Sequence, residues 1–205
     1  MNAEIDPSQA DFDIGDGHGP GRPGMVVRTH PETQQRHLDN LIWGLLPHDT
    51  ADPASAPRPI HARAETVATN PLFADAFRGR RAIVPVDEYF QQQTTPGRPQ
   101  RFAVSRIDGR PMAWAALWEA FRWPNGEITR STCVITVPAN GQLAAIHDRM
   151  PVVLEEESWP VWLGEQPCDA AALLVPAAEG ILRVRPVGAG RGALVIKLFP
   201  AIVCW

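Results

Sequence analysis

A series of short strand-like segments separated by tight turns is the feature that most constrains this fold. Apolar, β-branched and aromatic residues gather in such segments at 25–28, 41–46, 82–86, 102–107, 112–118, 132–137 and 181–187. The dipeptides Asp108-Gly109 and Asn125-Gly126 are typical of hairpin turns, so the segments between 102 and 137 are predicted to be antiparallel neighbours. Helix signals are fewer and short, at 70–79, 155–163 and 168–174. Many strands and few helices predict an α+β, mainly antiparallel fold around a strongly curved sheet.

The connections carry clear local signals. Residues 47–59 contain several prolines, which predicts a surface loop. Asn70-Pro71 predicts the start of a helix, with Asn as N-cap and Pro at the first helical position, and Gly79 predicts its end. Residues 91–100 are polar and predict a hairpin loop.

Both ends of the chain differ from its middle. Residues 1–24 are polar and rich in Gly and Asp, which predicts a flexible or loop-like start. Residues 189–205 form an apolar tail that carries the only lysine, Lys197. This tail is open to three interpretations: a final buried strand, an altered reading frame, or an unpacked end. At 205 residues the chain is expected to form a single domain over residues 1–205.

The composition excludes several classes of protein. The net charge of −4 gives no global attraction to nucleic acid, although clustered arginines could still form a local basic groove. The cysteines have neither metal-binding nor disulfide spacing, which fits a reducing compartment. There is no bilayer-spanning stretch and no signal sequence, so we expect a cytoplasmic protein. No phosphate loop or dinucleotide fingerprint is present, so no cofactor is expected. The apolar segments also contain the tryptophans expected in the core, Trp43, Trp114 and Trp118.

A chemical signal lies in residues 145–151, Ala-Ile-His-Asp-Arg-Met-Pro. His147 stands beside a carboxylate and a guanidinium, with apolar residues on both sides of the triplet. This combination can hold a proton donor next to an anion-binding group in a defined geometry. The alternative is a core histidine whose ring is satisfied by Asp148 or by the backbone.

Three segments together resemble the motifs of the SOS response-associated peptidase (SRAP) family, in the same order and at similar spacing. The family's Asn-Ala-Arg-x-Glu-Thr corresponds to residues 61–66, which read His-Ala-Arg-Ala-Glu-Thr. Its Pro-Ala-Asp-Gly-aromatic-aromatic-Glu-Trp corresponds to residues 85–92, and its Ile-His-Asp-Arg-Met-Pro is intact at residues 146–151. The resemblance covers roughly residues 24–188. It implies a pseudo-barrel fold and a role in shielding abasic sites in single-stranded DNA.

The family's chemistry assigns roles to matching positions. In the family, the α-amine of an N-terminal Cys attacks the abasic-site aldehyde, and its thiol then closes a thiazolidine crosslink. The resemblance implies candidate catalytic positions at His147, Gln91 and His61, the first two as the acid/base pair and the third as the group that positions the sugar. It implies DNA-phosphate contacts for Arg63 and Arg149. The implied partner is abasic single-stranded DNA, bound by a monomer with no membrane association.

The chain departs from the family at several of these positions. His61 replaces an Asn, Gln91 replaces the catalytic Glu, and Gln92 replaces a Trp. An amide cannot act as a general acid or base. No Cys follows Met1, and the Asn in second place predicts that Met1 is retained. A chain that starts about two dozen residues late would explain the missing Cys but not the other replacements. We therefore expect a divergent member that binds DNA and has lost crosslinking and self-cleavage.

Other interpretations remain open. One is an active crosslinking autopeptidase whose N-terminal Cys lies upstream of Met1. Another is a metal-dependent hydrolase that uses His61, His147 and Glu65, although their spacing matches no known metal signature. Arg63 and Arg149 could instead be paired structurally with Glu65 and Asp148.

Structural interpretations also exist for the remaining candidates. His61 could be a surface residue at the end of the proline-rich loop. Asp87 could simply cap a turn, and Gln91 to Gln93 could belong to a solvated loop.

Overall fold

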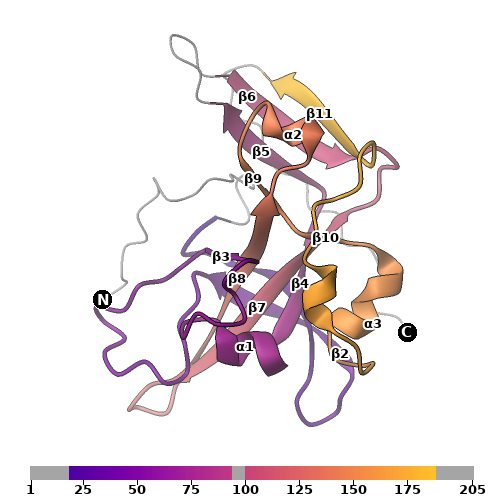
Figure 1. Cartoon of the computed structure of the whole chain (residues 1–205). Coiled ribbons are helices and arrows are strands. Elements are labelled where there is room, and N and C mark those ends of the chain that lie inside the picture. Colours follow the sequence, from indigo (N-terminus) through magenta and orange to yellow (C-terminus); the bar gives the residue numbers. More distant parts are fainter. Residues whose placement is uncertain (1–18, 94–99, 188–205) are drawn as a thin grey trace.

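A computed structural model of the protein describes residues 19–93 and 100–187, and within them five strands close into a barrel (Figure 1). These strands are β1 (Pro23–Thr29), β2 (Arg36–Trp43), β4 (Arg81–Val86), β7 (Met112–Arg122) and β8 (Ile128–Pro138). The ring runs β7–β4–β1–β2–β8 and closes because β8 also pairs with β7. All of these pairings are antiparallel except the parallel pair β2–β8. The predicted curved and mainly antiparallel sheet is therefore confirmed, and its closure leaves the barrel strands without a free edge.

Three short strands extend the sheet beyond the ring. β3 (His61–Arg63) runs parallel to β8, β9 (Arg149–Pro151) runs antiparallel to it, and β10 (Val153–Leu154) pairs with β7. The 11 residues of β8 make this possible, because its first half pairs with β7 and its second half lies between β3 and β9. The second half of β8 is therefore the platform on which the two histidine motifs meet.

A separate three-stranded sheet stands above the barrel in Figure 1. It consists of β5 (Glu88–Gln93), β6 (Gln100–Arg106) and β11 (Leu182–Val187), with β6 in the centre. The predicted loop at 91–100 is therefore wrong at both of its ends, because Gln91 to Gln93 pair with residues 100–102 of β6. The prediction that β6 neighbours β7 is also wrong. The turn at Asp108-Gly109 is present, with Gly109 at φ 74°, but it passes the chain from the small sheet to the barrel.

The helices are short, as expected, but one begins later than predicted. α1 spans Ala74–Gly79, so its end is as predicted and its start is not. Asn70 accepts a hydrogen bond from the Leu72 backbone N–H at 3.0 Å, which closes a local turn before the helix instead of capping it. The other helical segments are α2 (Gly141–Ala144), η3 (Glu156–Ser158), α3 (Trp159–Trp162) and η4 (Ala170–Leu173). No helix in the described part of the chain is long and apolar enough to cross a membrane.

Tryptophans hold the barrel to its surroundings. Trp43, Trp114 and Trp118 are buried, as predicted. The indole N–H of Trp43 donates to the Ile60 carbonyl at 2.8 Å, which fixes the end of the loop just before β3. The indole N–H of Trp162 donates to the Ala82 carbonyl at 2.7 Å and secures α3 to β4. The loop predicted at 47–59 contains neither helix nor strand. The expectations for residues 1–18 and for the tail from 188 onward lie outside the described residues.

Candidate functional site

The register of β3, β8 and β9 gathers three of the predicted site residues on one face. His61 lies opposite Val134 of β8, and Arg63 lies opposite Thr136, two residues further along. Arg149 lies opposite Pro138, again two residues on. Because side chains alternate between the faces of a sheet, residues two apart point the same way. The sheet therefore brings together His61, Arg63 and Arg149, which come from motifs far apart in the sequence.

His147 reaches this face from the turn between α2 and β9. Its Nδ1 lies 2.9 Å from the backbone N of Arg149 and 3.1 Å from the Arg149 carbonyl oxygen, so it accepts from the N–H in one tautomer and donates to the carbonyl in the other. Asp148 Oδ1 also lies 3.2 Å from Nδ1. The ring is 21% exposed. The local contacts fix its orientation and leave it open to a ligand, which is consistent with both interpretations made from the sequence.

His61 is held as a neutral ring. It packs edge-on against Trp43, with ring centroids 5.8 Å apart, and its Nε2 is buried. Burial of the ring, with smaller contributions from the positive charges of His147 and Arg149, lowers the pKa of His61 to about 3. The imidazole therefore carries no charge near neutral pH, and it is too weak a base to accept a proton there. It can still donate one hydrogen bond and accept another, as an Asn amide can.

Gln91 lies inside the protein and not in a solvated loop. It is 3% exposed on β5, where it lies opposite Phe102. Its neighbour Gln93 donates a hydrogen bond to the Ala145 carbonyl at 2.7 Å, which joins the end of β5 to the segment that carries His147. The Oε1 of Gln91 is buried and has no hydrogen-bond partner in the described structure. Gln91 is therefore a buried acceptor beside the His147 segment.

The two candidate arginines differ in their availability. Arg149 is held by Glu65 through two hydrogen bonds, of 2.5 Å and 3.0 Å, and by the Thr136 carbonyl at 2.6 Å. The sequence left open that these two arginines pair with Glu65 and Asp148; in the structure Arg149 pairs with Glu65, while Asp148 contacts His147. Arg63 is exposed, and within the described residues its side chain makes no hydrogen bond or ion pair. Arg63 is thus ready to bind an anion, whereas Arg149 already holds one.

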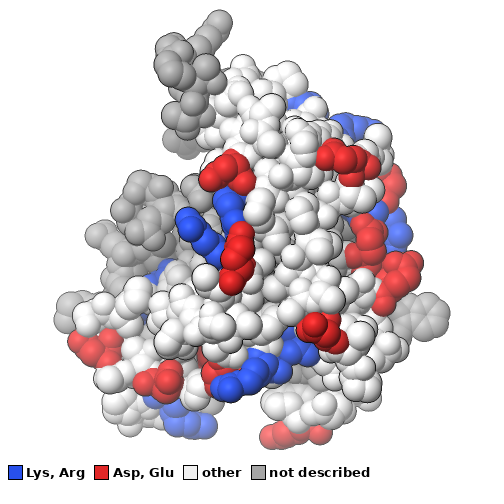
Figure 2. Space-filling model, in the orientation of Figure 1, with Lys and Arg blue, Asp and Glu red and all other residues white. Residues whose placement is uncertain are grey.

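The surroundings of the site are mixed in charge. On the face drawn in Figure 2, acidic and basic side chains of the described residues are interleaved and form no continuous basic surface. A cavity of about 330 Å³ adjoins Glu65, and its remaining walls are apolar or backbone. These walls are Ala64, Val67, Ala68, Phe77, Val137, Pro138, Ala171, Leu174 and Pro176. None of the described residues that line the cavity carries a positive charge.

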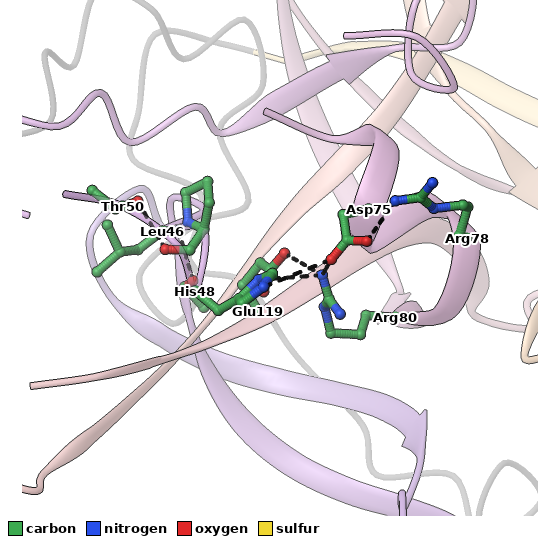
Figure 3. A network of polar contacts seen from close by, with 9 residues as sticks. Leu46, His48, Thr50, Asp75, Arg78, Arg80 and Glu119 are labelled. Carbon is green, nitrogen blue, oxygen red and sulfur yellow. Dashed lines mark hydrogen bonds and ion pairs between the residues drawn. The ribbon is translucent and has the colours of Figure 1, made fainter. Parts of the chain in front are cut away.

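A second polar cluster, which the sequence analysis missed, lies between α1 and β7 (Figure 3). The NH2 group of Arg80 donates to Asp75 at 2.5 Å and to Glu119 at 2.8 Å, and it lies 3.4 Å from His48 Nδ1. Glu119 is only 2% exposed, so its charge needs a close partner. His48, Asp75 and Glu119 are near enough to share a metal ion, but the guanidinium of Arg80 already supplies the cation. These pairings join positions far apart in the sequence, and no motif signals them.

The metal-site and cysteine expectations can also be compared with the structure. Among the described residues, His48, Asp75 and Glu119 have ligand atoms close enough together to hold a metal ion. His61, His147 and Glu65 do not form such a group in the described structure. The donor geometry thus gives no support to the metal-dependent hydrolase. Cys133 is buried and Cys168 exposed, and both are free thiols.

Comparison with protein families and individual relatives gives a consistent match. The model of the SOS response associated peptidase (SRAP) family matches residues 5–190. The chain is 31% identical over 145 residues to the abasic site processing protein YedK of Escherichia coli, covering 70% of this chain and 63% of that protein. It is 31% identical over 133 residues to the abasic site processing protein YoqW of Bacillus subtilis, covering 64% of this chain and 59% of YoqW. The chain thus spans about three fifths of the length of these curated relatives.

Solved structures show the same fold at lower sequence identity. A protein from Bacteroides thetaiotaomicron superposes with a TM-score of 0.74 at 22% identity, covering 82% of this chain and 75% of that chain. A protein from Bordetella bronchiseptica superposes with a TM-score of 0.72 at 22% identity, covering 91% of this chain and 98% of that chain. At this identity the likeness concerns the fold alone.

Proposed function

This chain belongs to the SOS response-associated peptidase (SRAP) family, and from that membership we propose that it recognises abasic sites in single-stranded DNA without crosslinking to them. The observation that carries the proposal is the shared face of β3, β8 and β9, where His61, Arg63 and Arg149 lie together beside His147. The abasic-site processing named for YedK and YoqW supports the choice of ligand.

Arg63 is the proposed anchor for the DNA backbone. A guanidinium binds a phosphate through two parallel hydrogen bonds, and Arg63 is exposed with none of its donors engaged by another described residue. A negatively charged protein needs such a local contact, because its overall field repels the strand. Phosphate contacts position the strand but do not read its sequence.

His61 takes the proposed place of the family's sugar-positioning Asn. Its low pKa keeps the ring uncharged, so it offers a neutral donor and a neutral acceptor, as the amide would. A charged imidazole at this position would place an additional cation beside Arg149. The replacement at position 61 is therefore compatible with retained binding.

Gln91 is the proposed reason for the loss of covalent chemistry. Schiff-base formation moves protons onto and off the sugar oxygen, and the family assigns this work to a Glu–His pair. An amide neither donates nor accepts a proton at neutral pH, so Gln91 could not share acid/base work with His147 as the family's Glu does. The proposed loss therefore rests on the amide at position 91.

The test is to incubate the protein with single-stranded DNA that carries one abasic site. A native gel reports binding, and a denaturing gel, run with and without borohydride to trap a Schiff base, reports covalent attachment. We expect a shifted native band and no heat-stable covalent band. A covalent band would overturn the binding-only proposal, and no retention of abasic or intact single strands would overturn DNA recognition.

A second candidate is an active crosslinking autopeptidase whose N-terminal Cys lies upstream of Met1. The abasic-site processing named for YedK and YoqW favours it, because the family's crosslink requires an N-terminal Cys. If the gene encodes an in-frame Met-Cys upstream, the extended protein should be tested in the same gels. A crosslink formed by the extended chain alone would select this candidate, and no crosslink from either chain would reject it.

A further inference from the structure

The ion pair between Arg149 and Glu65 occupies the part of the arginine that a DNA phosphate would use. Glu65 Oε1 lies 2.5 Å from NH1 of Arg149 and Oε2 lies 3.0 Å from NH2, so the carboxylate covers the forked edge of the guanidinium. The hydrogen bond from Arg149 lowers the pKa of Glu65, which keeps the carboxylate ionised near neutral pH. Arg149 is 16% exposed and Glu65 is 48% exposed, so the acid lies on the solvent side of the pair.

Arg149 does not need Glu65 to hold its position. Its NH2 donates to the Thr136 carbonyl at 2.6 Å and to Thr136 Oγ1 at 3.2 Å. The backbone of Arg149 is also fixed by the pairing of β9 with β8, opposite Pro138. The side chain is therefore anchored from within the sheet, and Glu65 can leave without releasing it.

A carboxylate and a phosphodiester bind the same edge of a guanidinium, because each presents two anionic oxygens to its paired N–H groups. Glu65 is also close enough to Arg63 for that charge to contribute to its lowered pKa. Glu65 therefore pairs with Arg149, while Arg63 lies near enough to feel its charge without forming an ion pair with it. A DNA phosphate that approaches the fork of Arg149 meets this carboxylate first.

We infer that Glu65 occupies, in the free protein, the place on Arg149 that a backbone phosphate of single-stranded DNA takes, and that it limits DNA affinity by competing for that arginine. The inference rests on the proposed function. It assigns Glu65 a role opposite to that of an orienting residue. An orienting carboxylate strengthens binding by holding Arg149 in place, whereas a competing one weakens it, so the two roles differ in the sign of one measurement.

Glu65→Gln is the decisive variant, because it removes the charge and keeps the size of an exposed side chain. The probe is a fluorescent single strand with one tetrahydrofuran residue, an abasic analogue without an aldehyde, and the readout is anisotropy. We expect Glu65→Gln to bind about two- to fivefold more tightly than wild type, the size of one partly exposed ion pair. The matched control is Glu165→Gln, which removes a similar two-hydrogen-bond pair with Arg36 on other elements. It should bind as wild type does.

A double-mutant cycle establishes that the effect passes through Arg149. In an Arg149→Gln background, Glu65→Gln should change affinity much less than it does in the wild type. Unchanged or weaker binding by Glu65→Gln, with wild type binding normally, would overturn the inference and leave the proposed function intact. An equal gain in Glu165→Gln would also overturn it, because net charge alone would then be responsible. If no variant bound the strand, the proposed function would fail together with the inference.

Discussion

His61 is the group through which we expect acid to weaken this fold. In the folded protein, burial, followed by the charges of His147 and Arg149, lowers its pKa to about 3. In an unfolded chain an imidazole titrates near about 6.5. As the pH falls, the unfolded chain therefore takes up the proton first. The stability that the neutral ring contributes is complete above about pH 6.5 and is lost progressively as the pH falls below it.

The magnitude follows from these two values. At pH 5.0 the unfolded imidazole is protonated by about thirty to one, while the folded ring stays neutral. The loss of unfolding free energy is about 1.36 kcal/mol multiplied by the decimal logarithm of the ratio of protonated to neutral imidazole in the unfolded chain, or about 2 kcal/mol. This figure hardly changes for any folded pKa below about 4, so it does not depend on the exact depth of the shift.

The assay is urea unfolding followed by tryptophan fluorescence at pH 7.5 and at pH 5.0. Wild type should lose about 2 kcal/mol more than His61→Asn between these two conditions. His37→Asn is the matched control, because His37 lies exposed on β2, and it should follow wild type. Equal losses in wild type and His61→Asn would show that the ring is not held neutral by burial. That result would also remove the argument that His61 replaces Asn without adding charge.

Three further outcomes are expected. Arg63→Gln should weaken binding to single-stranded DNA and reduce the salt dependence of log K by about 0.7, with unchanged thermal unfolding because the side chain is exposed. Arg80→Met should lower the unfolding free energy by about 3 kcal/mol in urea titrations, since it leaves the buried carboxylate of Glu119 without its guanidinium. Burial raises the pKa of the Cys133 thiol, so Cys133→Ser should leave the rate of thiol labelling of the folded protein unchanged, whereas Cys168→Ser should remove a fast-reacting group.

The strands could be predicted because their signals are local. Residues 112–118 and 132–137 carry continuous apolar runs, and both segments lie in long barrel strands. The neighbours of a strand are a different matter, since pairing depends on residues far away in the sequence. β6 is followed by the same kind of turn signal as β7, yet it pairs with β5 and β11 in the small sheet and not with the next strand of the chain. A turn dipeptide specifies a change of direction and not the sheet that the chain enters next.

The sequence predicts which site residues share a face where the spacing of a motif matches the alternation of side chains along a strand. The spacing of two residues between His61 and Arg63 places them on one face of any strand, and the register of β8 adds Arg149. Burial was not predictable in this way. Gln91 looked like part of a polar loop, because neither its type nor its neighbours indicate that it lies buried on a strand of the small sheet.

The buried amide of Gln91 argues for a site that still binds a ligand. A buried acceptor without a hydrogen bond costs about 1–3 kcal/mol, and the described structure leaves the Oε1 of Gln91 in that condition. A Leu at this position would avoid the cost in the free protein. A ligand hydroxyl, such as one on an abasic sugar, would supply the missing donor and recover the cost only in the complex. Under the proposed function, a neutral His61 and the Gln91 amide would offer hydrogen bonds to a sugar, while Gln91 lacks the acid needed to react with it.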